Sequence, residues 1–120
     1  MDPFHYYRRN ENKAGEFMFQ YDKRLGISVP APDQEWLEYG ADERQEIMHK
    51  WEMIRGKIPD RIHELEMLIN EKQHALDHED DFIQSCRLNT DISDLASIIN
   101  DLWLWFRTVP DVYPDEKPHA

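Results

Sequence analysis

The clearest hydrophobic pattern in the chain lies between residues 58 and 107, where apolar residues recur at helical spacing. In the first half of this region the apolar positions are Ile62, Leu65, Leu68, Ile69, Ala75, Leu76, Phe82, Ile83 and Cys86. Period-seven spacing, with no proline between Pro59 and Pro110, predicts helix rather than strand. Pro59 suits the first turn of a helix, because its missing N–H would have no partner there. Lys72 and Glu79 share this repeat and are expected at the edge of the apolar stripe.

A turn divides this region into two helices, and the sequence offers two places for it. We favour residues 88–91, because Asn89 tolerates the left-handed conformation that ends helices and Thr90 or Asp91 can cap the helix that follows. Residues 80–81 are the alternative, since either aspartate there can cap a new helix.

The second of these helices is apolar around most of its circumference. Its main stripe holds Ile92, Leu95, Ile99, Leu102 and Phe106, and further apolar residues lie beside that stripe: Ala96, Ile98, Trp103, Leu104 and Trp105. A helix of this kind is buried on more than one side, either inside the domain or at a subunit interface. The candidate interface is Ile98, Leu102, Trp103, Trp105 and Phe106. The alternative is that the N-terminal aromatic residues cover this surface within one chain, and both can operate together.

The pattern before residue 58 is less regular. Residues 12–25 are predicted to form a helix closed by Gly26, with an extended segment over residues 17–21 as the rival interpretation. Residues 27–32 contain two prolines and are expected to form an extended linker on the surface.

Two further helices are expected after this linker. Asp33 can cap a short helix that Gly40 closes, and Asp42 can begin another that ends near Gly56. The second of them would turn its apolar side chains inward: Ile47, Trp51 and Ile54. Residues 51–62 form a distinctive stretch to which the sequence alone attaches no function.

These elements predict an all-α protein. Short connections favour antiparallel neighbours, so we expect an up-down-up helical bundle over about residues 42–107, with the N-terminal helical or extended segments packed across it. The predicted parts are an N-terminal arm (1–32), a helical bundle domain (33–107) and an acidic, proline-containing tail (108–120).

Charge narrows the choice of partners. The net charge of the chain is −11, and residues 33–81 hold 15 acidic and 6 basic side chains. This disfavours direct binding to nucleic acid or to an anionic membrane. Cys86 is the one cysteine, which excludes an intramolecular disulfide and fits a reducing compartment. Because no apolar run approaches a membrane span or a secretory leader, we expect a cytoplasmic protein.

The sharpest candidate for chemistry is a set of four potential metal ligands on one helical face: Glu71, His74, His78 and Asp81. A second Glu-x-x-His pair, Glu46 and His49, invites comparison with di-iron helical bundles, whose ligands point into the core. Both groups are expected to lie opposite the apolar stripes, so we interpret them as a solvated polar face. The acidic run over residues 77–81 is interpreted in the same way rather than as a Mg²⁺ site.

The sequence therefore favours a non-enzymatic, acidic helical interaction protein, a regulator or adaptor that forms a homodimer through its aromatic last helix. An unidentified protein partner is expected, and no cofactor is. A metal-dependent enzyme using the carboxylate and histidine face of the long helix is the alternative. An acidic mimic of nucleic acid, bound to a basic partner, is a third and weaker hypothesis.

Overall fold

The computed structural model describes residues 19–31 and 35–108. The elements in chain order are β1 (Phe19–Asp22), β2 (Ile27–Pro30), the 3₁₀ helix η1 (Trp36–Glu38), α3 (Ala41–Arg55), α4 (Ile58–Asp77) and α5 (Phe82–Phe106). The structure is mostly helical, with one small two-stranded sheet. The predicted features at residues 1–18, 32–34 and 109–120 lie outside the described residues, and these include the aromatic arm, Asp33 and the acidic tail.

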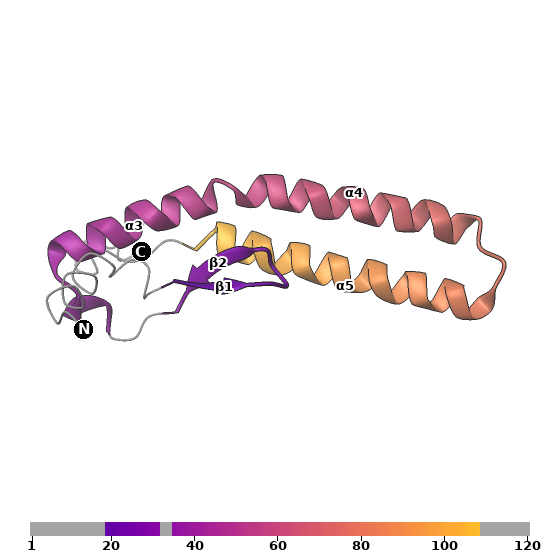
Figure 1. Cartoon of the computed structure of the whole chain (residues 1–120), viewed down its shortest axis with the longest axis horizontal. Helices are drawn as coiled ribbons and strands as arrows, with labels where there is room; N and C mark the ends of the chain where they lie inside the picture. The colour runs from indigo at the N-terminus through magenta and orange to yellow at the C-terminus, as the bar shows by residue number, and fades with distance from the viewer. Residues whose placement is uncertain (1–18, 32–34, 109–120) are drawn as a thin grey trace, which may run out of the picture.

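Helices α3 and α4 lie end to end along one edge of an elongated molecule, and α5 runs back antiparallel to α4 (Figure 1). The expected up-down-up arrangement of three helices is therefore corrected, because α3 does not fold back onto α4. The cause is the link between the two helices. Gly56 (φ −64°, ψ −18°) and Lys57 (φ −92°, ψ −9°) both keep a near-helical conformation, so the chain changes direction little.

The turn between α4 and α5 lies at the second of the two places that the sequence offers. Asp81 caps α5, its Oδ2 accepting a hydrogen bond of 2.9 Å from the Gln84 amide. The preferred turn at residues 88–91 is wrong, since these residues lie within α5. Thr90 donates its hydroxyl proton to the Cys86 carbonyl at 3.0 Å, an i to i−4 bond that is compatible with continuous helix.

Two sets of seam residues, spaced alternately by three and four, face each other between α4 and α5. In and just after α4 they are Ile58, Ile62, Leu65, Ile69, Lys72, Leu76 and Glu79, and in α5 they are Ser85, Leu88, Ile92, Leu95, Ile99, Leu102 and Phe106. All are buried or half-buried, as in a two-stranded antiparallel coiled coil. Lys72 is the basic member of the seam, and its Nζ pairs with Asp91 Oδ2 at 3.2 Å.

Residues 19–30 form a β-hairpin instead of the end of a helix. Phe19 pairs with Pro30 and Asp22 with Ile27 in antiparallel register. Gly26 has the left-handed conformation expected of it (φ 77°), but it closes the turn between two strands, with its amide 2.7 Å from the Asp22 carbonyl. The predicted helix over residues 12–25 is thus wrong for residues 19–25, and the rival extended interpretation of residues 17–21 is correct for residues 19–21, the part of it that the structure describes.

The segment after Gly26 is extended as expected over residues 27–30, but it is a strand whose Ile27 side chain is buried in the core. In η1, Glu35 takes the capping position, with its amide 2.9 Å from Glu38 Oε1. Helix α3 begins one residue before Asp42, and its Gly40 cap donates an amide hydrogen bond to Glu43 Oε1 at 2.8 Å.

The hydrophobic core lies where α3 meets α4, opposite the end of α5 and beneath the hairpin. Its buried members are Leu25, Ile27, Trp51, Ile58, Ile62, Leu65 and Leu102. Tyr39 and Ile47 form a second, smaller cluster against Phe19 and Trp36. Trp51 and Ile47 are fully buried, as their inward spacing on α3 predicts. The far end of the α4–α5 pair holds no fully buried side chain.

Candidate interaction surface

Two side chains of α3 hold the C-terminal end of α5. Trp51 Nε1 donates a hydrogen bond to the Thr108 carbonyl at 2.7 Å, and Arg55 donates one to the Phe106 carbonyl at 2.9 Å. The Arg55 guanidinium also lies over the Phe106 ring, 5.1 Å from its centroid. The Phe106 carbonyl is among the last of α5, which have no partner within the helix, and the Thr108 carbonyl lies just beyond it, so these two donors satisfy groups that would otherwise need water.

One side chain of α4 holds the β-hairpin. Arg61 Nε donates to the Leu25 carbonyl at 2.9 Å and lies directly against Gly26, where an added Cβ would come within 2.5 Å of the guanidinium. The distinctive stretch 51–62 therefore has a structural role: it carries Trp51, Arg55 and Arg61, which join α3, α4, α5 and the hairpin at one place.

Most of the predicted interface residues are used within the chain. Leu102 is fully buried, and Ile98, Trp105 and Phe106 are half-buried against the core. The Trp105 ring meets Trp51 edge to face, with centroids 5.9 Å apart. Only Trp103 of the five predicted residues is exposed, and its neighbour Leu104 is exposed beside it. Cover within one chain was expected from the N-terminal aromatic residues, whereas in the described part of the chain it comes from α3, α4 and the hairpin.

A wider surface appears when α5 is followed along its whole length. We define the α5 outer face by ten residues that are all exposed and all uncharged: Phe82, Ile83, Cys86, Asn89, Thr90, Ser93, Ala96, Asn100, Trp103 and Leu104. The charged residues Arg87, Asp94 and Asp101 lie in one row along the border of this face, seven residues apart. Large apolar side chains are at both ends of the face, and small or neutral polar ones are between them.

The ends of this face expose a considerable amount of apolar surface. Phe82 is 79% and Ile83 62% exposed at one end, and Leu104 is 55% exposed at the other. The exposed side chains of α4 include five carboxylates, those of Asp60, Glu64, Glu66, Glu71 and Asp77, together with the apolar Met67 and Leu68. Sequence reasoning missed the α5 outer face because it followed apolar residues alone. The signal was available in the seven-residue spacing of the charged row, because the only other charged residue of α5, Asp91, lies on the side of that row nearer the seam.

The hairpin docks beside this face without covering its centre. Arg24 on the turn pairs with Asp101 at 2.8 Å and donates a hydrogen bond to the Ser97 hydroxyl at 3.0 Å. A depression of about 420 Å³ lies between the hairpin and α5, lined by Asp22, Arg24, Leu25, Asp101, Leu104, Trp105 and Thr108. The hairpin therefore contacts α5 at Ser97 and Asp101, along one border of the outer face, and leaves Ser93 and Ala96 exposed.

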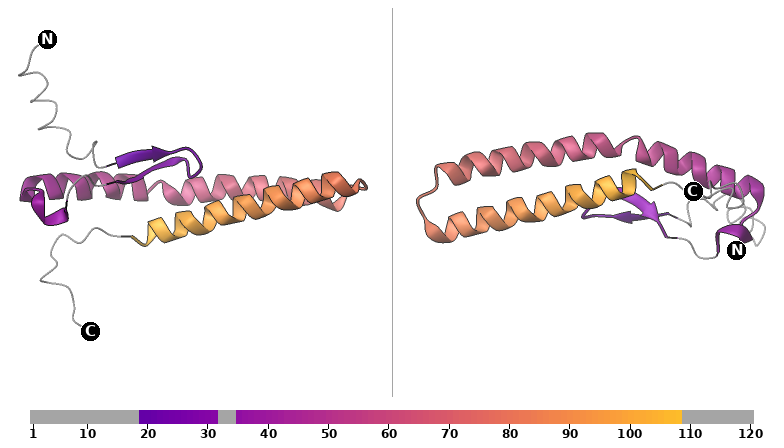
Figure 2. Two further views of the ribbon diagram at one scale, coloured as in Figure 1. Left: turned by 90° about the horizontal axis from the view of Figure 1, so that it is seen from below. Right: turned by 180° about the vertical axis from the view of Figure 1, so that it is seen from behind.

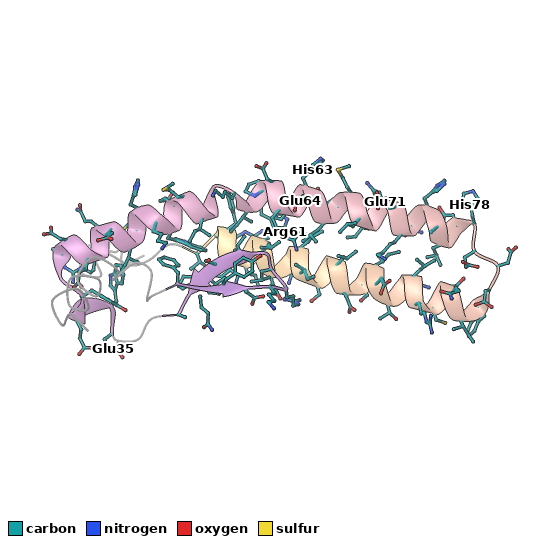
Figure 3. The ribbon with its side chains drawn as sticks, in the orientation of Figure 1. Glu35, Arg61, His63, Glu64, Glu71 and His78 are labelled. Atoms are coloured by element: carbon teal, nitrogen blue, oxygen red, sulfur yellow. The ribbon has the colours of Figure 1, made fainter. Side chains whose placement is uncertain are left out.

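The candidate metal ligands do not converge. His74 and His78 are neighbours on α4, with ring centroids 4.6 Å apart, and His78 Nδ1 lies 2.9 Å from the His74 carbonyl, to which it can donate. Asp81 instead caps α5. Figure 3 shows His63, Glu71 and His78 spread along the length of α4. Among residues 19–31 and 35–108 no group of three or more His, Cys, Asp or Glu side chains could hold a metal ion.

No protein-family model, no curated protein and no solved structure matches the chain at a significant level. Over the described part of the chain, none of the helices combines the length and the apolar character needed to cross a membrane. The feature that distinguishes one surface of this molecule from the others is the uncharged α5 outer face.

Proposed function

We propose that this chain is a non-enzymatic, acidic helical interaction protein of the cytoplasm, a regulator or adaptor that self-associates through α5. One observation carries the proposal: an exposed helix face that spans α5 has no charged side chain, in a chain of which 32% of the residues are charged. Exposed apolar patches, such as those at the two ends of this face, commonly mark interaction sites on small proteins. Aromatic residues such as Trp103 and Phe82 are the kind most enriched where binding energy concentrates.

The distribution of charge supports a second surface for a different partner. Residues 33–81 carry a net charge of −9, with 15 acidic and 6 basic side chains. In α4, Glu64, Glu66 and Glu71 are exposed. A basic protein surface would be attracted to this helix, and such attraction mainly raises the association rate. An adaptor would pair copies of itself through α5 and present α4 to its target.

Light scattering coupled to size-exclusion chromatography tests the self-association. The chain has a mass of 14.5 kDa, so a dimer should elute with a mass of about 29 kDa at concentrations of roughly 10–100 μM and shift toward the monomer on dilution. A mass of one chain at the highest of these concentrations, with the helical circular dichroism unchanged, would contradict the proposal. A concentration series is needed because small interfaces dissociate readily.

A further inference from the structure

We infer that the α5 outer face pairs with the same face of a second copy, in an antiparallel arrangement whose two-fold axis passes near Ser93. This inference rests on the proposed self-association and specifies its geometry. Closed dimers with a two-fold axis use the same patch on both subunits, so the patch must be complementary to itself. The sequence of the α5 outer face meets this condition in three ways.

First, the centre of the face is a straight row of small or medium-sized, uncharged side chains. Cys86, Ser93 and Asn100 follow one another at intervals of seven residues, and all are exposed. Seven residues are close to two helical turns, so the three lie nearly above one another. A two-fold axis at Ser93 places Cys86 of one copy opposite Asn100 of the other. Ala96, one turn from Ser93, adds another small side chain that lets two helices approach closely.

Second, the two apolar ends match in position. Phe82 and Ile83 precede Ser93 by 11 and 10 residues, and Trp103 and Leu104 follow it by 10 and 11. An antiparallel pair centred on Ser93 therefore brings Phe82 against Leu104 of the second copy, because both lie within about 20° of the direction in which Ser93 points. Ile83 and Trp103 lie on opposite flanks of the same face. Phe82 and Leu104 each gain an apolar neighbour, and burying one such side chain fully is worth roughly 1.5–3 kcal/mol.

Third, charge favours the antiparallel direction over the parallel one. The tip of the α4–α5 pair carries Asp77, Glu79, Asp80 and Asp81. A parallel pair would bring these two acidic tips together, whereas an antiparallel pair separates them by about the length of α5, roughly 37 Å. That distance is several times the screening length of about 8 Å at physiological salt, so the repulsion disappears. No member of the face is charged, and the nearest charges, Arg24 and Asp101, already pair with each other at 2.8 Å.

The size of the face sets the strength of the dimer. From Phe82 to Leu104 it is about 34 Å long, and it is one helix wide, about 10 Å. Such a strip falls at the small end of specific interfaces, below about 1,200 Å² of total buried surface. The dimer should therefore form reversibly at micromolar concentration.

Disulfide trapping tests the geometry in the full chain. Asn100→Cys, with the native Cys86 retained, places two thiols opposite each other across the antiparallel pair. Mild oxidation should then give a disulfide-linked dimer as the main product on a non-reducing gel. The wild-type chain should give none, because its two Cys86 residues would be about 21 Å apart along the helix, far beyond the roughly 7 Å between Cα atoms that a disulfide allows.

Two further variants control this experiment. Ser93→Cys in a Cys86→Ser background should also form the linked dimer, since position 93 lies on the two-fold axis. Asn70→Cys, again with Cys86 retained, exchanges another exposed asparagine, this time on α4, and should form none.

The outcomes separate this inference from the proposed function. Linking of the wild-type chain through Cys86 alone would show a parallel pair and overturn the inference. A dimer by light scattering that neither Asn100→Cys nor Ser93→Cys can trap would also overturn it, because the contact would lie elsewhere, and self-association would stand. A chain that stays monomeric at all concentrations would overturn both.

Discussion

The two ends of the α4–α5 pair are built on the same spacing but differ in burial. At the end near the hairpin, Ile58, Ile62, Leu65 and Leu102 are at most 2% exposed. At the far end, the corresponding seam residues Ile69, Leu76, Leu88 and Ile92 are only half-buried. Figure 2 shows the cause, since the hairpin and α3 lie beside the near end while the far end consists of two helices alone.

This difference shows what a third element contributes. A helix in a two-helix pair can bury one stripe, and its flanks stay in water. The near end adds Trp51 from α3 and Leu25 and Ile27 from the hairpin, and these close the seam from the side. The far end relies on partly covered apolar contacts and on the Lys72–Asp91 pair, whose side chains are 34% and 49% exposed. Pairs exposed to this degree stabilise by about 0–1 kcal/mol. We therefore expect the far end to open first.

The largest effect is expected for Trp51→Ala. This side chain is fully buried and contacts three elements, so its removal leaves a cavity and an unpaired Thr108 carbonyl. The loss of unfolding free energy should be about 3–5 kcal/mol, measured by chemical denaturation. Trp103→Ala is the matched control, because Trp103 is 36% exposed. It should cost the fold far less while weakening self-association, and equal losses for the two variants would contradict this account.

The next largest effect compares the stability of the two ends of the α4–α5 pair directly. Leu65→Ala removes a side chain that is 2% exposed and should cost about 2–5 kcal/mol. Leu76→Ala makes the same change on the same seam, where the residue is half-buried, and should cost roughly half as much or less. Thermal melts of both variants measure the ratio. A larger loss for Leu76→Ala would mean that the far end is the better packed one.

A smaller effect tests the joint between the hairpin and α4. Gly26→Ala forces a side chain into a left-handed backbone and against Arg61, so it should destabilise by at least about 1–2 kcal/mol. Gly56→Ala is expected to stabilise the fold instead. Gly56 is helical, and an added Cβ would be 3.4 Å from the nearest atom, the Glu52 carbonyl oxygen. This change should stabilise by about 0.4–1 kcal/mol. Effects of the same sign in the two variants would argue against the conformations assigned to these glycines.

The smallest effect belongs to the tip. Asp81→Ala removes the cap of α5 and should cost about 1 kcal/mol, with faster hydrogen exchange confined to the first turn of that helix. Asp80→Ala, one residue earlier, removes an exposed carboxylate that does not cap α5 and should change little. If Asp80→Ala were the more damaging change, α5 would begin elsewhere.

The sequence predicted the first apolar stripe only in part. Leu68, Ala75, Phe82, Ile83 and Cys86 are exposed, because the seam continues through Lys72 and Glu79 instead. Ile62, Ile69 and Leu76 lie where period seven places them, and the inward positions of Ile47 and Trp51 on α3 were also correct. The position of the turn was harder to predict, since local sequence preference and packing along the seam favour different conformations for the same residues. Asn89 and Thr90 favour a helix end, but they lie between seam residues Leu88 and Ile92 that continue the pairing with α4, and packing prevailed.

The arrangement of α3 and the hairpin could not be predicted from the sequence. Gly56 and Pro59 are typical of a helix end and a new start, but whether the chain reverses there depends on the backbone angles of two link residues. The strands are four residues each. In so short a segment the alternation of Phe19 and Tyr21 is a weaker signal than the helical pattern over residues 12–25. The candidate surface was only partly predicted, because Trp103 was named for its apolar character and the missing charge along α5 was not examined.

Hydrogen exchange of the α5 amides, compared between the wild-type chain and Ala96→Arg, tests the central claim most directly. Ala96 is exposed at the middle of the α5 outer face, so arginine there should block pairing without disturbing the seam. At a concentration at which the wild-type chain is dimeric, residues 82–92 should exchange faster in the variant, while residues 98–106 keep the protection that α3 and the hairpin give them. Equal exchange over residues 82–92 in the two proteins would contradict the claim that a second copy covers this helix.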